Sequence, residues 1–126
     1  MNIIICDDEQ VRHDTFEKHL TQAGHIVLHA FGSEECLEII QSCQEPIGAM
    51  MLDHDMPPGK NGSLLATDIL NLSKVKWPAR VIIHSLNSQG ALNIISKFQG
   101  AGIHTIYMPF MGDTTAQRVV SELVEQ

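Results

Sequence analysis

The chain alternates five times between a short apolar run and a longer segment whose apolar residues recur at helical spacing. The runs are rich in β-branched residues and occupy residues 3–6, 25–31, 47–53, 80–85 and 103–108. The helical segments occupy residues 11–23, 33–43, 63–72 and 92–98, with a last one from residue 113 or 114 onward. Parallel strands of one sheet are joined by right-handed crossovers. This order therefore predicts a single α/β domain with a doubly wound parallel sheet and helices on both faces.

Composition and charge exclude several classes of protein. The 126 residues are 44% hydrophobic and 18% charged, which is ordinary for one soluble globular domain. A net charge of −7 argues against binding to DNA or to an anionic membrane surface. No stretch approaches the ~20 apolar residues of a membrane span, and the N-terminus lacks the features of a signal peptide. We therefore expect a cytoplasmic protein.

Polar residues gather where three of the predicted strands end. The third run stops at Asp53, and Pro57, Pro58 and Gly59 then break the chain before the next helical segment. The ends of the first, third and fourth runs together carry Asp7, Asp8, Asp53, His54, Asp55, Ser85 and Asn87. The carboxyl ends of parallel strands share one edge of the sheet, where ligands bind in such folds. Asp53 is therefore the first candidate for a functional residue.

The carboxylates at this edge need a counter-charge. At about 5 Å and an effective dielectric near 20, each pair of carboxylates costs roughly 3 kcal/mol. Either one of them is protonated or a cation lies among them. Oxygen ligands with room for water suit Mg²⁺ or Mn²⁺, which in turn attract phosphate oxygens. Asp7 and Asp8 could instead stabilise the N-terminus of the following helix by ~0.3–1 kcal/mol, but that role leaves Asp53 at the same edge unexplained.

These residues, in this order, resemble a response-regulator receiver domain over essentially the whole chain. The matching positions are Asp7-Asp8, Asp53-His54-Asp55-Met56-Pro57, Ser85 and Pro109-Phe110. The resemblance implies a flavodoxin-like sheet of strand order 2-1-3-4-5 spanning residues 1–126, with no output domain. It implies Asp53 as phosphoryl acceptor and Ser85 as the hydroxyl that contacts the phosphoryl group. It also implies that Asp7, Asp8, Asp53 and the backbone carbonyl of Asp55 hold the metal. A histidine kinase or phosphotransfer protein would then be the partner.

Two positions depart from the receiver pattern. Receivers normally carry lysine just before the Pro-Phe pair, where this chain has Met108. The aromatic switch residue three positions earlier is replaced by Thr105. Because no ammonium group at residue 108 can pair with a phosphorylated Asp53, we expect a weakened relay from the site to the surface.

A narrower resemblance fits those departures. The sequence LDHD at residues 52–55, and His84-Ser85 followed by Asn87, are similar to the LDHD and HSxN motifs of cyclic-phosphate-processing receivers. That branch implies that histidines join the metal site and act on a cyclic phosphate, with a cyclic-phosphate nucleotide as substrate. His54 and His84 would be general acids or bases; the alternative is that each only hydrogen-bonds a neighbouring loop. Asn87 is either a turn residue or a site residue.

Strand alternation bears on this choice. His54 and His84 each adjoin a residue assigned to the site, so alternation predicts that the two imidazoles point to opposite faces of the sheet. The other histidines are expected to be structural or to lie on the surface: His13, His19, His25, His29 and His104.

Two other functions fit the same architecture. One is a degenerate receiver that serves only as a protein-interaction module, which Met108 and Thr105 favour and the intact Asp7, Asp8 and Asp53 disfavour. The other is a flavodoxin-like cofactor binder. The chain lacks a phosphate loop rich in Gly, Ser and Thr after its first run, which argues against a flavin site.

Overall fold

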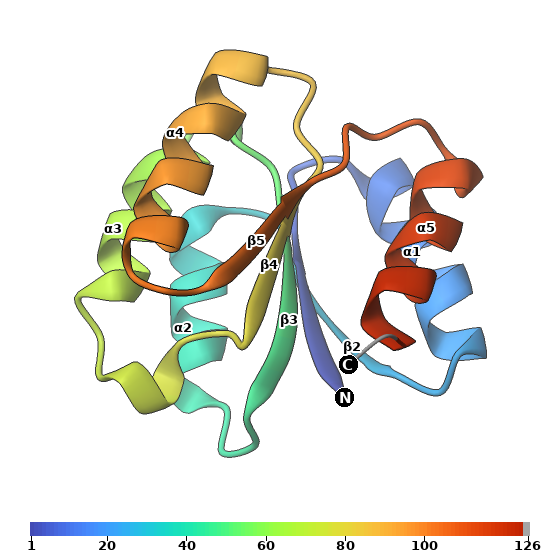
Figure 1. Ribbon diagram of the computed structural model, residues 1–126, viewed down its shortest axis with the longest axis horizontal. Coiled ribbons are helices and arrows are strands. Elements are labelled where there is room, and N and C mark those ends of the chain that lie inside the picture. The colour runs from blue at the N-terminus through green and yellow to red at the C-terminus, as the bar shows by residue number, and fades with distance from the viewer. Residues whose placement is uncertain (125–126) are drawn as a thin grey trace.

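The computed structural model describes residues 1–124 and contains one five-stranded parallel sheet between two layers of helices (Figure 1). The strands are β1 (Asn2–Cys6), β2 (Ile26–Ala30), β3 (Ile47–Leu52), β4 (Arg80–Ile83) and β5 (His104–Tyr107). Their order is β2-β1-β3-β4-β5, and every pairing is parallel. The predicted fold class and strand order are confirmed.

The helices divide between the two faces of the sheet. On one face lie α1 (Gln10–Gln22) and α5 (Asp113–Val124). On the other lie α2 (Ser33–Ser42), α3 (Gly62–Leu70) and α4 (Ser88–Gly100), with the short 3₁₀ helix η1 (Lys74–Lys76) before β4. No helix within residues 1–124 is both long enough and apolar enough to cross a membrane.

Each face of the sheet has its own apolar core, and the strands alternate between the two. Ile3 and Ile5 of β1 pack under α1 and α5, whereas Ile4 and Cys6 face α2, α3 and α4. The sheet lies between the two cores, and the register of its strands decides which side chains lie in one row. On the α1/α5 side, Ile5 is opposite Met51, and Met51 is opposite Ile82.

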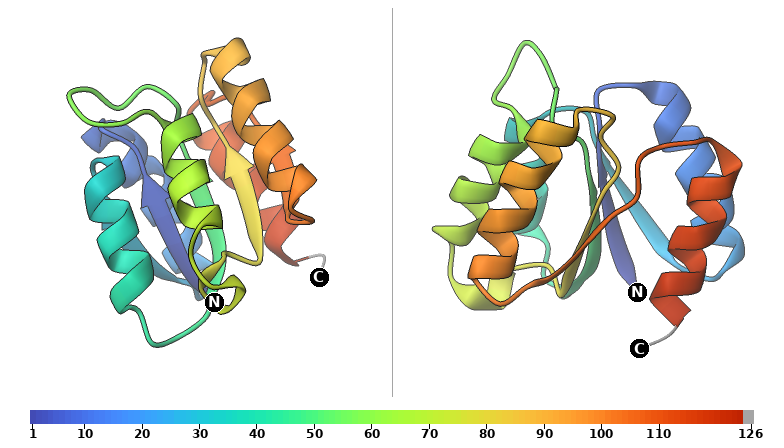
Figure 2. Two further views of the ribbon diagram at one scale, coloured as in Figure 1. Left: turned by 90° about the vertical axis from the view of Figure 1, so that its left-hand side faces the viewer. Right: turned by 45° about the horizontal axis from the view of Figure 1, so that its top comes forward.

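Asparagine side chains determine where two helices begin. Asn61 accepts a hydrogen bond from the Leu64 N–H at 2.9 Å and caps α3, so the helix begins before Ser63. Asn87 accepts from the Gly90 N–H at 3.0 Å and caps α4, which begins inside a stretch that the sequence suggested was a turn. Both caps lie on the loops that follow the carboxyl ends of β3 and β4. That edge, with the projecting connection from β3 to α3, is seen in Figure 2.

Candidate functional site

Three buried side chains from neighbouring strands meet at the carboxyl edge. Each lies two residues after a member of the row Ile5, Met51 and Ile82. Backbone hydrogen bonds continue the strand register past the strand ends, so the three side chains again lie in one row. They are Asp7, Asp53 and His84, and one potential ligand atom from each lies within 4.8 Å of the others. The His84 Nε2 lies 2.6 Å from Oδ2 of Asp7, and both side chains are fully buried. Sheet geometry therefore places all three on the α1/α5 side.

Arg12 completes this group, which we call the buried cluster (Asp7, Arg12, Asp53 and His84). Its Nη1 donates to Oδ2 of Asp7 at 3.3 Å and to Oδ2 of Asp53 at 3.2 Å. Its guanidinium lies 5.5 Å from the centre of the Phe110 ring. The sequence reasoning missed Arg12. A cation in the first turn of a helix is disfavoured by the helix dipole, and this was the signal that it has an acidic partner.

The pKa values of the two carboxylates in the buried cluster are shifted in opposite directions. Burial raises the pKa of Asp7, but the hydrogen bond and charge of His84, with lesser help from Arg12, bring that pKa below its ordinary value. Burial and the charge of Asp7 hold the pKa of Asp53 above its ordinary value, and His84 and Arg12 offset this only partly. Asp7 is therefore the more strongly ionised carboxylate of the pair.

A cavity of about 310 Å³ opens beside Asp53. Its walls are Asp8, Glu9, Arg12, Asp53, Asp55, Pro57, Ser85, Leu86 and Asn87. Asp8 is exposed at its mouth, where partial burial and the neighbouring Asp7 raise the pKa of the Asp8 carboxyl. The Oγ of Ser85 accepts a hydrogen bond from the Asn87 N–H at 3.0 Å. The predicted site residues Asp8, Asp53, Asp55, Ser85 and Asn87 therefore share one cavity, with Asp7 behind Asp53.

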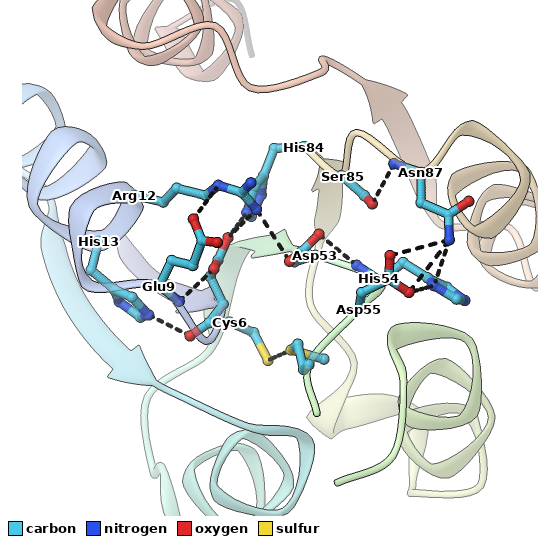
Figure 3. A network of polar contacts seen from close by, with 12 residues as sticks. Cys6, Glu9, Arg12, His13, Asp53, His54, Asp55, His84, Ser85 and Asn87 are labelled. Carbon is cyan, nitrogen blue, oxygen red and sulfur yellow. Dashed lines mark hydrogen bonds and ion pairs between the residues drawn. The ribbon is translucent and has the colours of Figure 1, made fainter. Parts of the chain in front are cut away.

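A second group, which we call the rim cluster (His54, Asp55 and Asn87), lies on the other side of Asp53 (Figure 3). Nδ1 of His54 is 2.8 Å from Oδ1 of Asp55, and Nδ2 of Asn87 donates to Oδ2 of Asp55 at 3.2 Å. The hydrogen bond from His54, followed by that from Asn87, lowers the pKa of Asp55 despite slight burial. The Asn87 side chain thus caps α4 and contacts Asp55, and its part in the function stays a prediction.

The two histidines point to opposite faces, as strand alternation predicts. Figure 3 shows His84 with Arg12 on one side of Asp53 and His54 with Asp55 on the other. Each imidazole contacts an aspartate, and neither lines the cavity. The His54 ring packs so closely on α4 that a methyl group at Gly90 would collide with it. Both histidines thus hold a carboxylate of the site in place.

Of the two alternatives expected for His13, a structural role or a place on the surface, the structure shows the structural one. It is fully buried, and its Nε2 lies 2.8 Å from the backbone carbonyl oxygen of Asp7. A carbonyl oxygen only accepts, so Nε2 of His13 carries the proton. Its Nδ1 lies 2.7 Å from Nδ1 of His29, which in turn contacts Glu17. This chain of contacts fixes the backbone at Asp7 against α1 and β2.

The donor set fits a divalent cation. Two carboxylates with oxygens close together, a third at the cavity mouth and a hydroxyl are hard ligands. Nε2 of His84 is engaged with Asp7, so His84 acts as the hydrogen-bonding support that carboxylate ligands commonly have. In this structure the counter-charge between Asp7 and Asp53 is the Arg12 guanidinium.

Comparison with known proteins shows the family of this chain. Residues 2–100 match the family model described as the cyclic-phosphate processing receiver domain. The chain belongs to that family. No curated protein matches it.

Solved receivers share its fold at low sequence identity. The N-terminal domain of a response regulator/sensory box/GGDEF protein from Carboxydothermus hydrogenoformans is 18% identical, with TM-score 0.73 and coverage of 98% of this chain and 94% of that chain. The response regulator TrrA from Thermotoga maritima, in complex with Mg²⁺ and BeF, is 21% identical, with TM-score 0.73 and 97% of each chain covered. The chemotaxis response regulator CheY4 of Vibrio cholerae is 15% identical, with TM-score 0.74 and 97% of each chain covered.

The two departures of this receiver are accounted for by packing. Met108 is buried in the core between the sheet and the α1/α5 layer, so its side chain does not reach the cavity. The hydroxyl of Thr105 is buried and donates to the Ile103 carbonyl at 2.9 Å. The half-buried Tyr107 instead donates to the Ser85 carbonyl at 2.9 Å, which ties β5 to the cavity wall.

Proposed function

We propose that this receiver accepts a phosphoryl group on Asp53 with the help of Mg²⁺ or Mn²⁺. The observation that carries this proposal is the carboxylate of Asp53 in the cavity wall, with Asp7 behind it and Asp8 at the mouth. Asp7, Asp8, Asp53 and the backbone carbonyl of Asp55 hold the metal, and the hydroxyl of Ser85 contacts the phosphoryl oxygens. The donor is a histidine kinase or a phosphotransfer protein.

In this reaction an oxygen of Asp53 attacks phosphorus while the bond to the donor's leaving group breaks. The nucleophile is the ionised carboxylate of Asp53, whose negative charge is disfavoured by burial and by the charge of Asp7. A divalent cation bound beside Asp53 would supply positive charge next to this carboxylate and would neutralise the phosphoryl oxygens. Asp7 stays ionised throughout because His84 and Arg12 stabilise its charge.

The test is intact-mass spectrometry after incubation with acetyl phosphate and Mg²⁺. We expect a gain of one phosphoryl group in wild type and none in Asp53→Asn. If wild type folds and binds Mg²⁺ but gains no phosphoryl group, Asp53 is not a phospho-acceptor, and the protein-interaction module and the opening of a cyclic phosphate remain.

A second candidate is the opening of a cyclic phosphate, with a cyclic-phosphate nucleotide as substrate. It is favoured by family membership and by the hydrogen bonds of the rim cluster, which join the LDHD and HSxN motifs beside the cavity. Neither imidazole lines the cavity, so His54 and His84 act on such a substrate through Asp55 and Asp7. Incubation with 2′,3′-cyclic nucleotides and Mn²⁺ tests it: turnover lost in both His54→Ala and His84→Ala supports this activity, and no turnover in wild type removes it.

A further inference from the structure

Arg12 has hydrogen-bonding capacity that its protein partners do not use. A guanidinium carries five N–H donors in a planar fork. Within residues 1–124, its contacts with Asp7 and Asp53 come from Nη1, and its contact with Glu9, at 3.4 Å, comes from Nε. The donors of Nη2 therefore remain for another acceptor.

Arg12 is the one basic residue among the described residues of the cavity wall. The same wall carries Asp8, Glu9, Asp53 and Asp55, so an anion entering the cavity meets strong repulsion. Nη1 of Arg12 is 3.2 Å from Oδ2 of Asp53, which places the guanidinium against the carboxylate that would carry the phosphoryl group. An anion at Asp53 thus has a fixed cationic neighbour.

Two further contacts hold Arg12 in this place. The ring of Phe110, which follows β5, lies 5.5 Å from the guanidinium, and Glu9, the residue just before α1, contacts Nε at 3.4 Å. The side chain is only 14% exposed, so its charge acts through a poorly screening medium. Met108, after β5, is buried in the core and brings no charge to the cavity.

We propose that Arg12 is the phosphate-binding residue of this site, and that α1 supplies the cation which β5 lacks. The proposal rests on the proposed function. Without an anion, Arg12 neutralises Asp7 and Asp53 and so competes with a divalent cation for them. With an anion on Asp53, its fork donates to the phosphoryl oxygens. Arg12 therefore weakens metal binding and strengthens anion binding.

The experiment measures both affinities separately in wild type, Arg12→Gln and Arg12→Lys. Mg²⁺ affinity is measured by calorimetry, and beryllofluoride affinity at saturating Mg²⁺ by amide chemical shifts. In Arg12→Gln we expect unchanged or tighter Mg²⁺ binding and a loss of beryllofluoride affinity of about 10- to 100-fold. Arg12→Lys retains the charge but not the fork, so its anion affinity lies between the other two. Arg118→Gln, an equal charge change at an exposed site on α5, is the matched control and should match wild type.

The possible outcomes separate this proposal from the proposed function. Anion affinity that stays within twofold of wild type in Arg12→Gln overturns the role of Arg12 alone. A parallel loss of Mg²⁺ and beryllofluoride affinity shows that Arg12 only holds the carboxylates in place, and also overturns it. A wild type that binds neither ligand overturns the proposed function together with this proposal. If Arg12→Gln does not fold, Arg12→Lys decides by the same pair of affinities.

Discussion

The site contains two His–Asp pairs with similar contact distances in very different surroundings. In the buried cluster, His84 and Asp7 lie 2.6 Å apart with both side chains 0% exposed. In the rim cluster, His54 and Asp55 lie 2.8 Å apart, but the Asp55 side chain is 62% exposed. A polar pair at the surface contributes ~0–1 kcal/mol, whereas a buried acceptor left without its donor costs about 1–3 kcal/mol, and more when the acceptor is charged. The buried pair therefore supports the fold and the charge of the site, and the rim pair only orients Asp55.

The largest expected effect is on folding stability. His84→Leu leaves Asp7 buried without its closest partner, so we expect a loss of about 3 kcal/mol in the free energy of unfolding. His54→Leu leaves a carboxylate that water can solvate, so the loss should stay below about 1 kcal/mol. Urea denaturation of the two variants measures the difference. Equal losses would show that the buried pair contributes no more to the free energy of unfolding than the rim pair.

The next effect tests the packing of the rim cluster. Gly90→Ala forces a methyl group into the His54 ring, and such overpacking typically costs about 1–3 kcal/mol. Gly100→Ala is the matched control at the end of the same helix, because a methyl group there meets nothing within 4 Å. We expect the control to be as stable as wild type or more so. Thermal unfolding of both variants decides whether the contact with His54 is tight.

The two carboxylates of the buried cluster should respond oppositely to pH. The folded pKa of Asp7 is lowered, so Asp7 stabilises the fold above its ordinary pKa and loses this effect as the pH falls through the lowered value. The folded pKa of Asp53 is raised, so ionised Asp53 destabilises the fold at neutral pH, and this penalty disappears on acidification.

We therefore expect Asp53→Asn to be more stable than wild type at pH 7, and Asp7→Asn to be less stable. The difference for Asp53→Asn should shrink as the pH falls through the raised pKa of Asp53 toward about 4, and the difference for Asp7→Asn only below about 4. Urea denaturation from pH 7 to pH 3 measures them. A destabilised Asp53→Asn at pH 7 would contradict this assignment of charges.

The smallest effect concerns the helix cap at Asn87. Asn87→Ala removes the side-chain acceptor for the Gly90 N–H, which should cost about 1 kcal/mol of stability. Asn87→Asp keeps the cap but removes the donor to Asp55. If the cap is the main contribution, Asn87→Asp stays close to wild type in thermal unfolding; a larger loss in Asn87→Asp assigns the stability to the rim cluster.

The two clusters also differ in how far the sequence predicts them. Apolar runs that end in polar residues predict the sheet edge that carries Asp53 and Ser85, and the two-residue period of a strand predicts that His54 and His84 diverge. That Asp7, Asp53 and His84 form one row depends on the register between strands, which no local pattern contains. This row is set by the pairing of Ile5 with Met51, because that pairing also fixes which residues lie opposite one another further along the strands.

Arg12 and His13 were harder to foresee for another reason. Both lie on α1, and both contact residues at the carboxyl edge of the sheet. These contacts depend on how α1 packs against the sheet and on how far each side chain reaches. The helical spacing of α1 places His13 in the buried layer with Phe16 and Leu20, but it does not show that the carbonyl of Asp7 lies there. Contacts between a helix and a strand end arise only once the layers are packed.

The central claim is that phosphorylation of Asp53 depends on the carboxylates beside it and only weakly on the imidazole at the rim. The most direct measurement is the rate at which Asp53 gains a phosphoryl group from acetyl phosphate, with and without Mg²⁺, in wild type, Asp7→Asn and His54→Gln. We predict a rate that requires Mg²⁺ in wild type, falls by at least about 10-fold in Asp7→Asn and falls less in His54→Gln. A rate independent of Mg²⁺, or one that His54→Gln lowers more than Asp7→Asn does, would contradict it.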